Sequence, residues 1–412
     1  MNFKKVMAAV LAGTMVFGMA SSVSAATEVS FWTLNTRQNA VEPIVEAFNE
    51  ANSDIKVTAS FYDTDGIKDA CKVAASSDTL PSMWFNWGGS LGSFYVDNDK
   101  TYDLTQYAKD NGWSDEFTEA ALNLCTFDNK LSGYPTSYNA LGVYYSKQIF
   151  DDCGIEVPTT FDEFEAALKT LKDNGYTPMD TAGLNGWHVM RWLELLVEHY
   201  AGSELHDKLN TFEESWDCEA VVQAFTKYKE WVDAGYFPDG FLTLDPNDTI
   251  MAMGTGECAM DLQGQWYDGT MIQNDLDPND YGVFAFPSGD SNRMSAFAEM
   301  TQFNKNLSDE ELDACVKFMD YYYSDDSVDQ YGEYYNLPLP KQGKKAPADQ
   351  VNVDGMLETS NTNGTFTITD QAFPTEVADV LFNAQDAVAN DEMTPEEAAS
   401  NIQKAIEEYQ AK

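Results

Sequence analysis

Aromatic side chains at strand ends and in glycine-flanked loops are the residues of this chain that could hold a ligand. A flat ring packs against the apolar C–H face of a sugar, while neighbouring amides and carboxylates hydrogen-bond its hydroxyls. The candidates are Trp32, Asn35, Asn86, Trp87, Tyr138, Asn139, Trp187, Gln263, Trp266 and Glu299. By contrast, Trp192, Trp216 and Trp231 occur at helical spacing, so we expect them in the core. The pattern predicts a carbohydrate-binding surface.

The segment 88–92 (GGSLG) matches the G-x-S-x-G pattern of a serine hydrolase, and it follows a predicted strand. A hydrolase of that order also needs a histidine that follows an acid, usually near the C-terminal end of the chain. The only histidines are His188, His199 and His206, and none of them lies near that end. We therefore interpret the segment as a glycine-rich binding loop.

The sequence gives little support for a glycosidase, a metal site or a cofactor site. A retaining glycosidase needs two carboxylates about 5 Å apart, and no block among the 68 acidic residues nominates such a pair. The segment 275–279 begins like a Ca²⁺-binding loop, but Asp280 stands where glycine is required and Phe286 where glutamate is required. We predict a turn there, no metal site and no cofactor, because phosphate-binding and dinucleotide-binding motifs do not occur in the right context.

Six cysteines could form three disulfides in an exported protein, or they could be free thiols. They are Cys71, Cys125, Cys153, Cys218, Cys258 and Cys315. Cys218 and Cys315 lie at helical spacing from apolar residues, and no Cys-x-x-Cys motif occurs. We favour free, buried thiols that behave as small core residues.

Residues 1–25 have the features of a cleavable secretory signal. Lys4 and Lys5 precede an apolar stretch at 6–19, and small residues follow at 24–26. The apolar stretch is shorter than the roughly 20 residues that span a bilayer. No cysteine stands near the cleavage site, so we expect no lipid anchor and a location in the periplasm or at the extracellular cell surface. The formal net charge of −44 argues against nucleic acid and anionic lipid as partners.

The elements that must position the aromatic residues alternate between strands and helices. Residues 28–33 and 55–61 are predicted strands around a helix with an apolar face at 41–48, and a third strand follows residue 80. This order predicts an α/β fold with parallel pairing. Capping boxes at Thr160, Ser308 and Thr394 predict three later helix starts. The length exceeds that of one ordinary core, so we expect two domains.

Several blocks in a fixed order resemble the extracellular solute-binding proteins of ABC importers, family 1, the sugar-binding kind. An aromatic strand after a proline turn, at 133–147, is similar to the first crossing between the two lobes in that family. The other blocks lie at 31–49, 80–89, 157–171, 231–238, 256–260 and 264–266. Each block alone is weak, but together they extend over most of the chain.

The resemblance implies a two-lobed periplasmic-binding-protein-like fold with a ligand cleft between the lobes and several hinge crossings. Crossings are expected near Ser137–Tyr138, Phe297 and Leu339. Lobe one would comprise 26–137 plus about 297–339, and lobe two 138–296 plus about 340–412. The expected function is capture of a carbohydrate, an oligosaccharide, for delivery to the membrane permease subunits of an ABC transporter. We expect a monomer without enzymatic activity. A polyamine or other cationic ligand stays open as an alternative, as does a secreted glycosidase.

Overall fold

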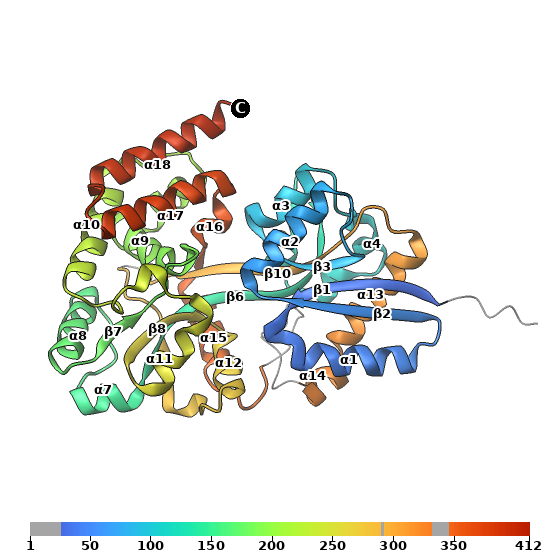
Figure 1. Cartoon of the computed structure of the whole chain (residues 1–412), viewed down its shortest axis with the longest axis horizontal. Coiled ribbons are helices and arrows are strands. Elements are labelled where there is room, and N and C mark those ends of the chain that lie inside the picture. The colour runs from blue at the N-terminus through green and yellow to red at the C-terminus, as the bar shows by residue number, and fades with distance from the viewer. Residues whose placement is uncertain (1–25, 290–291, 332–345) are drawn as a thin grey trace, which may run out of the picture.

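The computed structural model describes residues 26–289, 292–331 and 346–412. The predicted signal segment and the crossing expected near Leu339 lie outside these residues. The chain forms two lobes that are joined by long central strands (Figure 1). No helix in the described ranges is both long and apolar enough to cross a membrane.

The lobe on the right of Figure 1 begins with a parallel strand–helix–strand unit, as predicted. Strand β1 (Thr27–Leu34) pairs in parallel with β2 (Ile55–Tyr62) and with β3 (Met83–Trp87). The apolar face of the intervening helix α1 (Gln38–Ala51) is buried. The other elements of this lobe are α2 (Thr64–Ser76), α3 (Gly89–Asp97), α4 (Thr105–Asp110), α5 (Trp113–Glu116), α6 (Glu119–Leu124), β4 (Thr126–Phe127), β5 (Lys130–Leu131), α13 (Asp309–Tyr322) and α14 (Asp325–Tyr331).

Two long strands, β6 (Gly133–Ser146) and β10 (Met294–Phe303), run from one lobe into the other. At its C-terminal end β10 pairs antiparallel with β3, whereas its first residues pair with β11 (Thr365–Thr367). The first half of β6 pairs with β10, and its second half pairs with β8 (Cys258–Gly264) and β9 (Tyr281–Phe284). One sheet therefore extends through both lobes in the order β2-β1-β3-β10-β6-β8-β7, with β7 at Thr177–Asp180.

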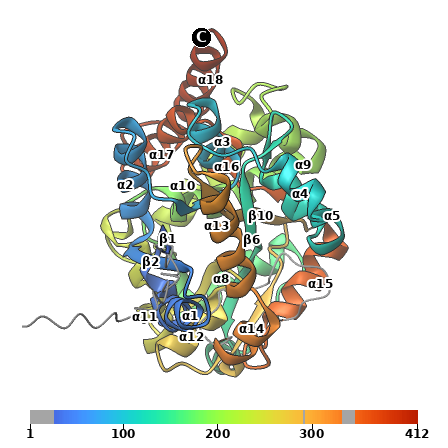
Figure 2. The ribbon, with the colours of Figure 1, turned by 90° about the vertical axis from the view of Figure 1, so that its right-hand side faces the viewer.

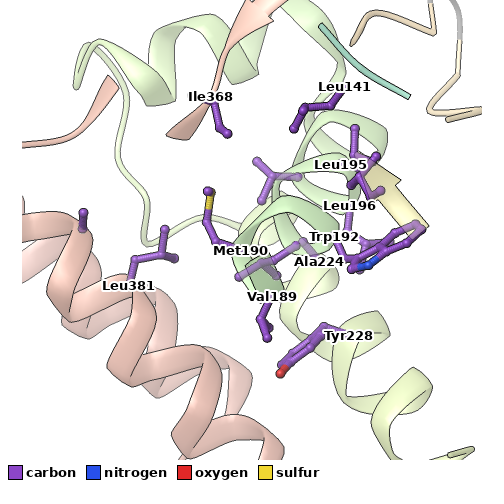
Figure 3. Close-up of a cluster of buried hydrophobic side chains, with 14 of the residues drawn as sticks. Leu141, Val189, Met190, Trp192, Leu195, Leu196, Ala224, Tyr228, Ile368 and Leu381 are labelled. Carbon is purple, nitrogen blue, oxygen red and sulfur yellow. The ribbon is translucent and has the colours of Figure 1, made fainter. Parts of the chain in front are cut away.

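Helices cover the rest of the sheet in the second lobe. They are α7 (Lys147–Cys153), α8 (Phe161–Asp173), α9 (Trp187–Asn210), α10 (Glu219–Asp233), α11 (Thr249–Thr255), α12 (Tyr267–Gln273), α15 (Val353–Asn363), α16 (Thr369–Ala372), α17 (Thr375–Ala389) and α18 (Pro395–Gln410). Short 3₁₀ helices lie at Asn35–Arg37, Phe241–Thr243, Pro246–Asp248 and Pro278–Asp280. The first half of α9 is buried on all sides: Met190 lies on the side toward Leu381 of α17, and Trp192 lies on the opposite side (Figure 3). This central helix fixes the position of any side chain in its first turns.

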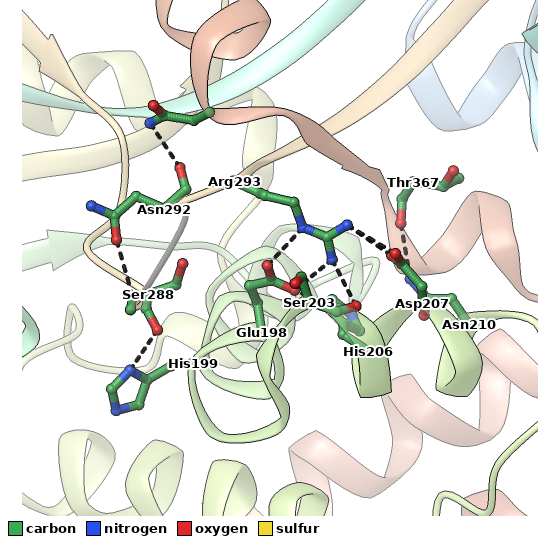
Figure 4. Close-up of polar contacts among 12 residues, drawn as sticks. Glu198, His199, Ser203, His206, Asp207, Asn210, Ser288, Asn292, Arg293 and Thr367 are labelled. Carbon is green, nitrogen blue, oxygen red and sulfur yellow. Dashed lines mark hydrogen bonds and ion pairs between the residues drawn. The ribbon is translucent and has the colours of Figure 1, made fainter.

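A buried ionic cluster ties the far end of α9 to the start of β10 (Figure 4). The helix is kinked at Gly202, whose φ is +70°. Arg293 donates from Nε and Nη2 to the two oxygens of Glu198, at 2.9 and 3.0 Å. His206 Nδ1 lies 2.7 Å from the same carboxylate. Burial opposes ionisation of Glu198, but the hydrogen bonds from His206 and Arg293 outweigh it and lower the pKa of Glu198 to about 2.

Local predictions agree with the structure in several places. All three capping boxes are present, at the starts of α8, α13 and α18. The three tryptophans assigned to the core are fully buried. All six cysteines are free thiols, with Cys153 and Cys218 half-buried and the other four buried. The segment at 275–279 is a turn, in which Asp277 accepts a hydrogen bond from the backbone of Asn279 at 2.9 Å.

Candidate ligand-binding site

A cleft lies beside the two strands that connect the lobes. Residues from both lobes line it, among them Thr64 of α2, Asn247 before α11 and Phe297 of β10. The void measures about 820 Å³ when it is counted out to the solvent. The cavity itself has a volume of about 170 Å³, below the roughly 300–1,000 Å³ that is common for ligand pockets, so a larger ligand would extend into the open part of the cleft.

Five of the ten candidates from the sequence line this cleft. Trp87 ends β3, Trp187 begins α9 and Trp266 lies directly before α12, so all three indoles lie at element ends. Gln263 comes from β8 and Glu299 from β10. Aromatic surface and polar groups thus converge on one cavity from both lobes, which is the combination that carbohydrate recognition requires.

Two asparagine candidates have their amides engaged by the sheet and do not line the cleft. Asn86 is buried and donates to Gln302 Oε1 at 2.8 Å and to the Leu91 carbonyl at 3.1 Å. Asn139 is buried as well and donates to Ser137 Oγ at 3.0 Å. In this arrangement both amides stabilise the junction between strands. Their contact with a ligand stays a prediction.

The remaining three candidates also lie outside the lining of the cleft. Trp32 is half-buried and packs against the Tyr62 ring with 5.1 Å between centroids. The Tyr138 hydroxyl lies 2.7 Å from Thr365 Oγ1 of β11, and Asn35 is exposed in a short 3₁₀ helix. These three residues also stay predictions.

Arg191 lines the cleft, although it was not among the ligand-binding residues predicted from the sequence. Its guanidinium carbon lies 4.6 Å from the ring centre of Trp187 and 5.4 Å from that of Trp266, and its exposed fraction is 6%. Burial lowers the pKa of Arg191 to about 10. The surrounding apolar run made this turn of α9 look like core. The available signal was the spacing of four residues from Trp187, which places both side chains on one helix face.

Glu299 enters the cleft with its charge already compensated. Its Oε2 atom accepts from Arg37 Nη2 and from Ser137 Oγ, both at 2.5 Å. The Arg37 guanidinium is buried and stacks over Phe85 at 4.6 Å. Burial disfavours the charged form of Arg37, but the Glu299 carboxylate outweighs it and raises the pKa of Arg37. The pair joins the end of β1 to the middle of β10.

A buried network beneath the cleft fixes the orientation of Gln263. Gln263 Nε2 and the Tyr267 hydroxyl both donate to Asp261 Oδ2, each at 3.0 Å. His188 Nε2 lies 3.2 Å from the other carboxylate oxygen. Burial alone would raise the pKa of Asp261, but these hydrogen bonds outweigh it and lower that pKa. The amide oxygen of Gln263 is thereby directed to Arg191 Nη1, at 3.3 Å.

The G-x-S-x-G segment allows a close contact between α3 and α16. Gly89 has a φ of +60°, and a Cβ atom there would lie 2.2 Å from the Gln371 carbonyl oxygen. Ser90 Oγ donates to the Asp370 carbonyl at 3.1 Å. The pattern therefore serves close packing between segments of the two lobes. Within the described ranges, no group of three or more His, Cys, Asp or Glu side chains is placed to hold a metal ion.

Comparison with known proteins agrees with this architecture. Residues 33–329 match the family model described as bacterial extracellular solute-binding protein. The chain is 26% identical over 249 residues to an uncharacterised ABC transporter extracellular-binding protein of Pyrococcus horikoshii, covering 59% of this chain and 56% of that one. It is 24% identical over 234 residues to the multiple sugar-binding protein of Streptococcus mutans, covering 52% and 53%. These alignments span about half the length of the curated relatives.

The solved structure of a chitin oligosaccharide binding protein is similar in fold, with a TM-score of 0.86 at 22% identity. The similarity covers 94% of this chain and 100% of that one. The family model itself matches well over half of the sequence. The chain belongs to the bacterial extracellular solute-binding protein family.

Proposed function

We propose that the protein captures a carbohydrate, an oligosaccharide, in the cleft and delivers it to the permease subunits of an ABC transporter. The observation that carries the proposal is the convergence of Trp87, Trp187 and Trp266 with Gln263 on one cavity. Indole faces suit sugar rings, and the amide suits hydroxyl groups. The names of the Streptococcus mutans relative and of the chitin oligosaccharide binding protein point to the same class of ligand.

Binding would act through hinge closure. A sugar that contacts both lobes stabilises the closed arrangement relative to open ones, because it makes its full set of contacts only there. We propose lobes of 26–137 plus about 297–339 and of 138–296 plus about 340–412, with β6 and β10 as the bending elements. The closed, loaded form would then be the one that docks on the permease.

The charges in the cleft argue against a polyamine as the ligand. Arg191 lines it, and Lys68 lies over the Trp87 ring at 5.0 Å in an adjoining void. Glu299, an acidic group that faces the cleft, is already paired with Arg37. Lys68 is likewise paired, with Asp65 at 3.1 Å, so a polycation would meet the unpaired charge of Arg191, which repels it. Its affinity would fall steeply with salt, whereas the affinity for a neutral sugar would change little.

A glycosidase activity has little support in the same geometry. Hydrolysis needs two carboxylates placed on either side of the scissile bond, and Glu299 is held by Arg37 and Ser137. Members of this family are binding proteins rather than enzymes. Prolonged incubation with oligosaccharides should therefore release no new reducing ends.

We propose further that residues 1–25 direct export and that the mature protein acts as a monomer in the periplasm or at the cell surface. Mass spectrometry of the secreted protein would locate the new N-terminus, and light scattering would give the oligomeric state. An N-terminus that retains the first 25 residues would contradict cleavage there.

A thermal-shift screen of the mature protein tests the ligand class. A ligand that binds only the native state stabilises it by about 2.7 kcal/mol at a hundredfold excess over its dissociation constant. We expect one glycan series to raise the melting temperature, and calorimetric titration would then give its affinity. A response to polyamines with none to sugars would overturn the proposed ligand while leaving the family assignment intact.

A further inference from the structure

Arg191 brings a positive charge to the cleft without an ion-pair partner. It lines both the main void and the adjoining void beside Lys68 and Asp370. Among the described residues no carboxylate lies within ion-pair distance, 4 Å, of its guanidinium. A buried charge without a partner is costly, and proteins normally pair it. The position of this one at the cleft suggests that the partner belongs to the ligand.

Two indoles contact this guanidinium. Trp187 and Trp266 both lie in cation–π contact with it, so its N–H edges remain for hydrogen bonds. Nη1 donates to the Leu262 carbonyl and to Gln263 Oε1, each at 3.3 Å. Nε is buried without a partner, and Nη2 has no hydrogen bond in the described part of the chain. The unpartnered donors therefore share one edge of the guanidinium, the Nε–Nη2 edge.

Arg293 shows what this edge does elsewhere in the same protein. Its Nε and Nη2 atoms clasp the two oxygens of Glu198 at 2.9 and 3.0 Å (Figure 4). Two parallel donors match the two oxygens of a carboxylate, or two oxygens of a phosphate. In Arg191, which lines the cleft, the corresponding Nε–Nη2 pair of donors, here called the fork, has no side-chain partner in the described part of the chain, and its Nε atom is enclosed.

The surrounding acids do not neutralise Arg191 by direct contact. Asp370, Asp261 and Glu194 act on it at a distance, yet burial prevails and the pKa of Arg191 is lowered. Asp261 is bound by Gln263 and Tyr267, and Glu194 accepts from the Thr369 backbone at 2.8 Å. An anionic group of the ligand, bound at the fork, would supply the counter-charge that Arg191 lacks.

We infer that the cleft selects a sugar that carries one oxyanion, a carboxylate or a phosphate, bound by the Nε–Nη2 edge of Arg191 through two parallel hydrogen bonds. The inference rests on the proposed function, because it names the kind of carbohydrate that the same cleft prefers. Lys68 and Asp370 both line the adjoining void, and Lys68 is already paired with Asp65 at 3.1 Å, so the unpaired positive charge of the cleft is that of Arg191.

Calorimetric titration with matched disaccharides tests the inference. Gluco-, galacto- and manno-configured disaccharides would each be used in four forms: neutral, 6-phosphorylated, hexuronic acid and methyl ester of that acid. We expect the acid or the phosphate of one series to bind at least tenfold more tightly than its neutral form at physiological salt. A preference for the acid identifies a carboxylate ligand, and one for the phosphate a phosphorylated ligand. Equal affinity of neutral and charged forms would overturn the inference and leave the proposed function standing. Failure of every form to bind would count against both.

Variants at two cationic residues separate the fork from general positive charge. Arg191→Met keeps an unbranched side chain beside the indoles and should abolish the preference, whereas Lys404→Met on the exposed face of α18, the matched control, should retain it. Arg191→Lys keeps the charge without the fork and should lose most of the preference. If Arg191→Met does not fold, the ratio of acid to methyl ester in the natural protein decides, since these ligands differ chiefly in charge. A ratio near one would overturn the inference.

Discussion

Asn185 donates a hydrogen bond from its side-chain amide to the Asp65 carboxylate, with 2.5 Å between Nδ2 and Oδ2. Asp65 lies in the first turn of α2, in the lobe that contains β1, and Asn185 lies just before α9 in the other lobe. Thr64 and Trp187, which line the cleft, are their near neighbours in sequence. The contact therefore bridges the two lobes directly at the cleft.

Asn185→Ala should shift the protein toward open arrangements. Loss of one hydrogen bond to a charged group removes about 1.5–3 kcal/mol where it is fully formed, and less where solvent replaces it. We expect a larger radius of gyration of the unliganded protein in small-angle X-ray scattering, together with weaker ligand binding. Asn401→Ala on the exposed face of α18 is the control. If both variants scatter and bind alike, the bridge does not influence closure.

Trp266→Ala should weaken sugar binding by about 1–3 kcal/mol, judged from the aromatic surface that it would offer to a ligand. Tyr409→Ala on the exposed face of α18 is a control, because this aromatic residue is not a candidate for the site. Calorimetric titration would compare both variants with the natural protein. Unchanged affinity in a folded Trp266→Ala variant would remove this indole from the site.

Glu299→Gln should lower the free energy of unfolding by about 3–5 kcal/mol. The substitution leaves the buried Arg37 guanidinium without a counter-charge, which is the costly way to break a buried ion pair. Glu28→Gln removes the exposed partner of Lys56 and should cost less than about 1 kcal/mol. Denaturant titration measures both values. If the free energy of unfolding falls by a similar amount in the two variants, the buried Arg37–Glu299 pair contributes no more to stability than the exposed pair.

The Glu198 cluster predicts an acid-dependent contribution to stability. The pKa of Glu198 is about 2 in the folded protein and about 4.3 in an unfolded chain. Because the folded value is the lower one, the stabilisation of about 3 kcal/mol is present above pH 4.3 and is lost as the pH falls toward 2.

The difference in unfolding free energy between the natural protein and Glu198→Gln should therefore shrink between pH 5 and pH 2. Glu204→Gln, which affects an exposed pair with Lys208 in the same helix, should give a much smaller difference throughout. A difference for Glu198→Gln that does not vary with pH would contradict the assignment.

Structural features that depend on residues close together in the sequence could be predicted from it. The capping boxes at Thr160, Ser308 and Thr394 mark true helix starts, because a cap involves only the first helical turn. The first strands and their parallel pairing followed from alternation and order. The tryptophans at element ends, Trp87 and Trp266, do line the cleft.

Features that depend on contacts between distant segments could not be predicted from the sequence. The Asn86 amide is engaged by Gln302, a residue of β10, and no local pattern announces that neighbour. Arg191 lies in an apolar run of α9, and its place in the cleft depends on Trp266 far along the chain. The kink of α9 at Gly202, within the continuous helix, was not predicted either.

The sheet shared by the two lobes bears on how the protein unfolds. Strands β6 and β10 are hydrogen-bonded to each other and to strands of both lobes, so neither lobe has a complete sheet of its own. Melting one lobe removes the backbone partners on which the other depends. Despite the two-part shape of the molecule, we therefore expect both lobes to unfold in one cooperative transition.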